Sequence, residues 1–95
     1  MTDTEKVILY SKVIKAWGIE SQIDMVMEET GELLSALGKI KRGRVTNKEV
    51  ITELADVSIM VEQMAVYFDL DSFREEKERK LTRLKERLEK YMTGN

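Results

Sequence analysis

Four acidic side chains, arranged as two pairs, carry the strongest chemical signal in this sequence. Glu29 and Glu32 lie three residues apart in the run EETGELL, and Glu53 and Asp56 lie three residues apart in ITELADV. On an α-helix this spacing places both carboxylates of a pair on one face, about one turn apart. Four carboxylates that come together repel one another unless a hard cation neutralises them. The spacing therefore predicts a metal site if the two helices fold against each other.

The residues around the two pairs indicate that the acids are metal ligands and not merely charges on a solvent-exposed helix face. Acidic pairs are common on solvated helix faces, so one pair alone would mean little. Here neither Glu29 nor Glu32 has a lysine or arginine three or four residues away in its own predicted helix. Both pairs are also flanked by large apolar residues, namely Met25, Val26, Leu33 and Leu34 for the first and Leu54, Val57 and Ile59 for the second. Unpaired acids beside apolar residues favour a ligand role.

An antiparallel hairpin would bring the two pairs together. If its turn centres near residues 44 and 45, Glu32 lies level with Asp56, and these two acids form the centre of the cluster. Glu53 then lies about 6 Å along the axis from the level of Glu32, and Glu29 lies one turn beyond on the other side. Magnesium suits a carboxylate set that leaves positions for water and phosphate, and manganese is a substitute. Calcium stays an alternative, although the sequence has no EF-hand loop.

The general base is expected at the edge of this cluster. An acid bound directly to a metal ion has its charge committed to that ion, so an edge acid is better able to accept a proton from water. Glu29 and Glu53 are the two edge positions. Glu53 is nearer the turn, where the basic segment KIKRGR could draw a triphosphate. Glu29 is therefore the expected catalytic base, as well as one of four expected ligands.

Four helices are expected to position these acids. The sequence has no proline, and its five glycines fall mostly where helices could end. Apolar periodicity predicts helices over about residues 5–17, 21–42, 47–68 and 72–92. The expected caps are Thr2 or Thr4, Ser21 with Asp24, Thr46 with Glu49, and Ser72 with Glu75. The predicted fold class is all-α, a four-helix bundle in a single domain of residues 1–95, with the third helix the most buried.

Composition predicts that this bundle is completed by oligomerisation. Charged residues make up 36% of the 95 residues, which leaves a narrow apolar stripe on each helix. The last helix has one apolar seam, formed by Leu81, Leu84, Leu88 and Tyr91. The third helix has apolar residues on more than one side, including Val57, Met60, Val61 and Met64. Part of the core is therefore expected from another copy of the chain, in a homodimer or homotetramer.

Charge and residue types exclude several functional classes. The 16 basic and 18 acidic residues give a net charge of −2, so we expect no nucleic-acid partner. The N-terminal MTDTEKVILYSKV is acidic before its apolar run, and apolar runs are short, so we expect neither a signal peptide nor a membrane span, and a cytoplasmic protein. The chain has no cysteine and no histidine, so catalysis must rest on carboxylates, amines or hydroxyls. Di-iron bundles, which use Glu-x-x-His motifs, are disfavoured.

Several runs of the chain resemble a known enzyme family. They are Trp17-Gly18, Gln22, MEETGELLSALGKIKRGR, ELADVSIMVEQ and KLTRLKERL, within roughly residues 15 to 91. The family is the MazG-like nucleoside triphosphate pyrophosphohydrolases, all-helical enzymes with a Glu-x-x-Glu pair on one helix and a Glu-x-x-Asp pair on the next. The matching positions are Glu29, Glu32, Glu53 and Asp56. The resemblance implies magnesium-dependent hydrolysis of a (deoxy)nucleoside triphosphate between its α and β phosphates, giving a monophosphate and pyrophosphate. Metal ions and one carboxylate base suffice for this chemistry.

The resemblance also implies residues that bind the substrate. Trp17 and Gln22 lie at the positions where the resemblance would place contacts to the base of the nucleotide. The alternative for Trp17 is a structural role, in which its ring packs as an apolar side chain at the end of the first helix. Lys80 and Arg83 match basic positions of the family's last helix, and a solvated charged face is the alternative for them.

The basic end of the second helix supplies two further candidates, Lys39 and Arg42, for contact with phosphates. Their alternative role is to complement the negative end of the helix dipole. Two other functions also stay open at the level of the sequence. One is a narrower relative of the family, such as a dimeric dUTPase or a phosphoribosyl-ATP pyrophosphohydrolase. The other is a helical interaction module without catalytic activity, whose acidic patch binds a partner.

Overall fold

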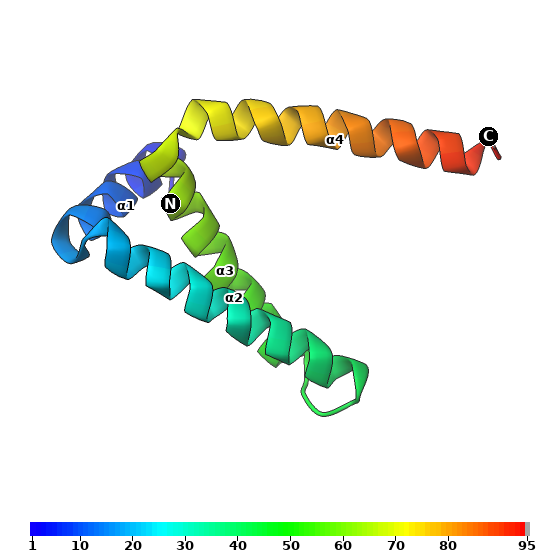
Figure 1. Ribbon diagram of the computed structural model, residues 1–95, viewed down its shortest axis with the longest axis horizontal. Helices are drawn as coiled ribbons and strands as arrows, with labels where there is room; N and C mark the ends of the chain where they lie inside the picture. The colour runs from blue at the N-terminus through cyan, green and yellow to red at the C-terminus, as the bar shows by residue number, and fades with distance from the viewer. Residues whose placement is uncertain (95) are drawn as a thin grey trace.

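The computed structural model describes residues 1–94 and contains, in that range, four α-helices and no strand. The helices are α1 (Asp3–Trp17), α2 (Ile19–Lys41), α3 (Asn47–Phe68) and α4 (Leu70–Met92). The all-α prediction is therefore confirmed. Figure 1 shows α2 and α3 side by side as an antiparallel hairpin, with α1 across the end where α2 begins and α3 ends. No helix among residues 1–94 is both long and apolar enough to cross a bilayer.

Two of the four helix starts follow the local capping signals in the sequence. At α1, the Glu5 N–H donates to Thr2 Oγ1 over 3.1 Å and the Thr2 N–H donates to Glu5 Oε1 over 3.2 Å. At α3, Thr46 and Glu49 make the same two reciprocal bonds, over 3.3 and 3.2 Å. Each capping box satisfies two backbone donors that the helix itself leaves unpaired.

The other two predicted starts are wrong, each because a neighbouring residue caps the helix earlier. Gly18, with φ +87°, ends α1 and begins α2 without a linker, so Ser21 lies inside α2 and its hydroxyl donates to the Trp17 carbonyl over 2.7 Å. Likewise the Asp69 carboxylate accepts the Ser72 N–H over 3.0 Å, so α4 begins at Leu70. A carboxylate is a strong N-cap acceptor, and it places Ser72 in the first turn.

The core is small and runs from the place where α1, α2 and α3 meet along the α2–α3 hairpin. Its buried apolar residues are Tyr10, Ala36, Val50, Met60 and Ala65, and two glutamines, Gln22 and Gln63, are buried with them. The third helix contributes four of these seven residues, so it is the most buried, as predicted. By contrast, no residue of α4 is buried; α4 packs against α3, and its Arg74 lies 4.0 Å from Asp3 of α1 (Figure 1). The hairpin and α1 thus form the body of the protein, and α4 projects from it.

A candidate metal centre between α2 and α3

The α2–α3 hairpin brings acids from both predicted pairs together. One carboxylate oxygen from each of Glu29, Glu53 and Asp56 can be chosen so that all three lie within 4.8 Å of one another. Glu29 comes from the middle of α2, and the other two come from the first half of α3. Because the helices run antiparallel, these positions lie at a similar level of the hairpin.

Glu32 lies beside this group of three. Among the neighbouring charges, that of the Glu32 carboxylate raises the pKa of Glu29 and of Glu53 most. No oxygen of Glu32 belongs to the three that converge. Glu32 was expected at the centre of the cluster, with Asp56, but the three converging oxygens come from Glu29, Glu53 and Asp56. Counting residues from the turn predicts how far along the helix each acid lies, but not in which direction around the helix axis its side chain points. We refer to Glu29, Glu32, Glu53 and Asp56 as the carboxylate cluster.

Two members of the carboxylate cluster are held in an environment that disfavours their charge. Glu29 and Glu53 are half-buried, and the Oε2 atom of each is buried without a hydrogen-bond partner. Burial, followed by the charge of Glu32 and then that of Asp56, raises the pKa of both carboxyls above the usual range. A buried oxygen without a partner is rare in folded proteins, and a bound cation is one way in which such an atom is satisfied.

The donor set fits a hard divalent cation. Among residues 1–94, no lysine or arginine lies within ion-pair distance of any acid in the carboxylate cluster. Three oxygens on one magnesium ion, at 2.0–2.1 Å each, are at most about 4.2 Å apart. The spacing of Glu29, Glu53 and Asp56 is therefore close to what such an ion requires.

A groove of about 390 Å³ opens beside the carboxylate cluster toward the α2–α3 turn. Glu32 and Glu53 line it together with Lys39, so one of the predicted phosphate-binding residues lies next to the acids. Arg42, the other candidate, follows the last residue of α2 and folds back over Gly38. The groove thus offers a single cation, Lys39, beside three acids, Glu32, Glu49 and Glu53.

A second, larger cavity of about 680 Å³ lies between α1, α2 and α3 and contains both predicted base-binding residues. Trp17 stands 68% exposed at its wall, and Gln22 is buried. Sequence reasoning missed Gln63, whose side-chain amide donates to Gln22 Oε1 over 2.6 Å. A signal was present, because Gln63 is a polar residue three positions after Met60, on the stripe that also carries Met64 and Tyr67.

Lys80 and Arg83 are not brought to the carboxylate cluster within one chain. They line a groove of about 320 Å³ on α4, together with Leu84 and Arg87. Since α4 contacts α3 but not α2, this groove stays apart from the hairpin that carries the acids. Lys80 and Arg83 therefore lie on the surface of α4 and, within one chain, are not part of the site formed by the carboxylate cluster.

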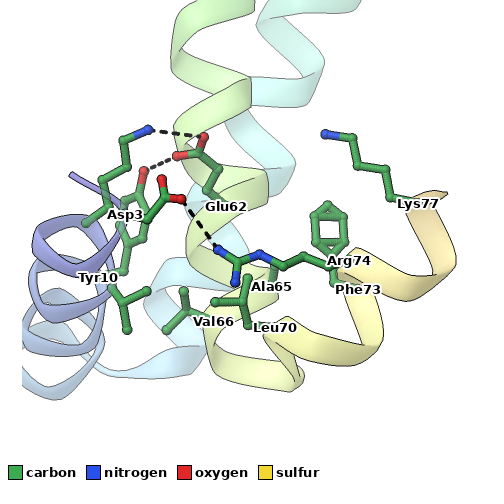
Figure 2. Close-up of a pocket in the computed structure, with 11 residues that line it drawn as sticks. Asp3, Tyr10, Glu62, Ala65, Val66, Leu70, Phe73, Arg74 and Lys77 are labelled. Carbon is green, nitrogen blue, oxygen red and sulfur yellow. Dashed lines mark hydrogen bonds and ion pairs between the residues drawn. The ribbon is translucent and has the colours of Figure 1, made fainter. Parts of the chain in front are cut away.

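A third cavity, of about 170 Å³, lies where α1, α3 and α4 meet (Figure 2). The Tyr10 hydroxyl donates to the Glu62 carboxylate, and Lys6 lies 3.9 Å from the same carboxylate. Burial, with help from this bond, raises the pKa of Tyr10 to about 12. On the opposite side of the cavity, Arg74 lies 4.0 Å from Asp3. These contacts anchor α1 to α3 and to the start of α4, and no local pattern in the sequence predicts them.

Comparison of the chain with protein-family models, with curated proteins and with solved structures finds no match.

Proposed function

We propose that this protein is a magnesium-dependent nucleoside triphosphate pyrophosphohydrolase of the MazG-like type, acting in the cytoplasm. The observation that carries the proposal is the convergence of Glu29, Glu53 and Asp56, with Glu32 beside them. Two of these acids hold a buried oxygen without a partner, and none has a cation of its own among residues 1–94. A solvated acidic face has no reason to bury such atoms.

In this proposal the carboxylate cluster holds magnesium, which supplies charge neutralisation for the phosphates and lowers the pKa of water. Glu32, Glu53 and Asp56 act as ligands. Glu29 accepts the proton of the attacking water. Lys39, beside Glu32 and Glu53 in the groove, contacts a phosphate.

The cavity that contains Trp17 and Gln22 receives the base in this proposal. Its walls are mainly apolar, and the Gln22–Gln63 pair supplies buried hydrogen-bonding groups. Apolar walls with a few placed polar groups are typical of sites for flat heterocyclic ligands.

The test is a panel of ribo- and deoxynucleoside triphosphates with magnesium, manganese or calcium, in which pyrophosphate and monophosphate are measured separately. We expect equal amounts of both products with magnesium or manganese, and none from the Glu53→Gln variant. Magnesium should also raise the melting temperature of the wild type, because binding only to the folded state stabilises it. Neither product and no change in melting temperature would overturn the proposal and favour a helical interaction module.

A further inference from the structure

Two glutamines, Gln22 and Gln63, are buried in the wall of the cavity between α1, α2 and α3. Gln63 is only 3% exposed, less than any apolar residue of the core. Burying an amide is costly unless its donors and acceptors find partners. The groups that this pair leaves without a partner therefore indicate what the cavity is suited to bind.

Both glutamines lie on the same helix faces as acids of the carboxylate cluster. Gln22 precedes Glu29 by seven residues on α2, and Gln63 follows Asp56 by seven residues on α3. Seven residues are two helical turns, so each amide lies about 10 Å along the hairpin from the acid that shares its face. The cavity extends to Met60, one turn from Asp56. A ligand whose anionic end binds at the carboxylate cluster can therefore extend along the hairpin to the amides.

A chain of hydrogen bonds sets the direction of each amide, and it begins at a backbone carbonyl. The Ser21 hydroxyl donates its one proton to the preceding turn, with the Trp17 carbonyl nearest at 2.7 Å, so its oxygen can only accept from Gln22. Gln22 Nε2 donates to this oxygen over 3.3 Å, which leaves Gln22 Oε1 as an acceptor. Gln63 Nε2 then donates to Gln22 Oε1 over 2.6 Å. Each bond thus determines which end of the next amide is left over.

The chain of hydrogen bonds ends in an acceptor without a partner. Among residues 1–94, Gln63 Oε1 forms no hydrogen bond. It is also not one of the side-chain atoms that are buried there without a partner, so it is accessible from the cavity. With the opposite order of bonds, in which Gln22 donates to Gln63, the cavity would meet an N–H group instead. The Ser21 hydroxyl therefore determines that this wall accepts a hydrogen bond.

We propose that Gln63 selects bases with an exocyclic amino group, cytosine and adenine, over bases with a carbonyl group at the same position, and that Ser21 is the positioning residue for this selection. The inference rests on the proposed function, which places the phosphates at the carboxylate cluster. In a pyrimidine the 4-substituent lies opposite the ring nitrogen that carries the sugar, so it extends farthest toward the amides. The amino group of cytosine donates to Gln63 Oε1, whereas the carbonyl oxygen of uracil meets a second acceptor. The dUTPase alternative is thereby disfavoured.

Binding of deoxynucleoside monophosphates tests the selection without requiring turnover. dCMP and dUMP differ only in the 4-substituent and the proton on the adjacent ring nitrogen, and dAMP and dIMP differ likewise at the 6-position. In calorimetry with magnesium, we expect the wild type to bind dCMP about 10-fold more tightly than dUMP, and dAMP about 10-fold more tightly than dIMP. Equal affinities, or tighter binding of dUMP and dIMP, would overturn the proposal.

Two substitutions of Ser21 test its positioning role. Ser21→Ala removes the acceptor that directs Gln22, so the preference for dCMP should be lost while dUMP binds at least as well as before. Ser21→Thr keeps a hydroxyl and should keep the preference. A purely structural role of Ser21 would weaken the binding of both nucleotides in the same proportion. Wild-type preference in Ser21→Ala would refute its positioning role.

Gln63→Leu removes the acceptor itself and should also abolish the preference for dCMP. Thermal melting of this variant checks that it folds, and the Ser21 variants give the answer if it does not, because Ser21 is exposed on α2. A folded Gln63→Leu variant that still prefers dCMP would refute the role of Gln63.

The failures of the two proposals are distinguishable. If the wild type hydrolyses triphosphates but binds dUMP as tightly as dCMP, the proposed function stands and the selection by Gln63 fails. If the wild type prefers dCMP but releases no pyrophosphate from any triphosphate, the cavity is a selective nucleotide site and the proposed function fails.

Discussion

Substitution of Glu32 is expected to abolish catalysis without destabilising the fold. Replacing Glu32 by Gln removes one negative charge from the carboxylate cluster but keeps the shape of the side chain. We expect turnover to be abolished, magnesium affinity to fall, and stability without metal to be unchanged or higher, because the charge that most disfavours ionised Glu29 and Glu53 is gone. Calorimetry of metal binding and thermal melting check this. Wild-type turnover at limiting magnesium would contradict it.

Burial and the charges of Glu32 and Asp56 raise the pKa of both Glu29 and Glu53, but the two acids have different roles in the proposed reaction. Glu29→Gln should bind magnesium nearly as well as the wild type and turn over at least about 100-fold more slowly, the loss expected for a general base. Glu53→Gln should lose metal affinity. Calorimetry and turnover at saturating magnesium compare the two. If Glu29→Gln loses metal binding as completely as Glu32→Gln, Glu29 is a ligand and not the base.

The raised pKa values give the metal-free protein a distinctive pH dependence. A carboxyl whose pKa is higher when folded than when unfolded stabilises the fold fully below its unfolded pKa, and this contribution is lost as the pH rises through its folded pKa. For Glu29 and Glu53 the loss begins above the ordinary value of 4.5. Asp69 has a lowered pKa, so its contribution to stability is present above pH 3.8 and is lost as the pH falls below that value.

Thermal melting in the presence of a chelator should therefore show stability falling as the pH rises above 4.5. The variant with both Glu29→Gln and Glu53→Gln should show a smaller fall over the same range, because neither amide titrates. Saturating magnesium should also reduce the fall in the wild type, since the cation favours the ionised carboxylates. Equal slopes for wild type and variant would show that these two carboxyls do not set the pH dependence.

At the scale of the helices, two glycines near each other in sequence should respond oppositely to alanine. Gly18 joins α1 to α2 at φ +87°, which side chains rarely adopt, so Gly18→Ala should destabilise the fold by about 1–3 kcal/mol. Gly31 lies inside α2, and an added Cβ would meet nothing within 4 Å. Gly31→Ala should stabilise the fold by about 0.5–1 kcal/mol. Urea unfolding measures both, and a destabilising Gly31→Ala would indicate that another surface packs there.

Sequence patterns predicted those features of the helices that depend on nearby residues. The number of helices, the cap at Thr2 (one of two candidates, with Thr4) and the capping box at Thr46 follow from residues within one or two turns. The starts at Ser21 and Ser72 were wrong because two nearby residues competed to cap the same turn. Such a competition depends on backbone geometry, which the residue types alone do not settle.

The candidate site was predictable in part for the same reason. The pairing of acids within α2 and within α3 is a property of local spacing, and one reversal of the chain then brings the pairs together. Contacts between residues distant in sequence were not predictable. Tyr10 and Glu62 are 52 residues apart, and Gln22 and Gln63 are 41 apart, so no periodic pattern links their side chains.

At the scale of the whole molecule, the direction of α4 is the feature that the sequence least determines. A narrow seam on a charged helix predicts one packing partner but does not say whether that partner lies in the same chain. In the structure α4 leaves the body after Phe73, and its seam has no partner among residues 1–94. In one chain, the four helices that the sequence predicts thus form a three-helix body and a projecting helix.

The projecting α4 also has a consequence for how the protein is degraded. Half of the 16 lysines and arginines lie in α4, and none of the residues 70–92 is buried, so trypsin meets its targets there on a helix that can open locally. Limited digestion should cut α4 first and leave a fragment containing α1 to α3. Mass spectrometry of timed digests identifies the first cut, and early cleavage within α1 to α3 would contradict this order. A protease that removes α4 would thus leave the acids of α2 and α3 in the remaining fragment, so loss of the last helix and loss of the carboxylate cluster are separate events.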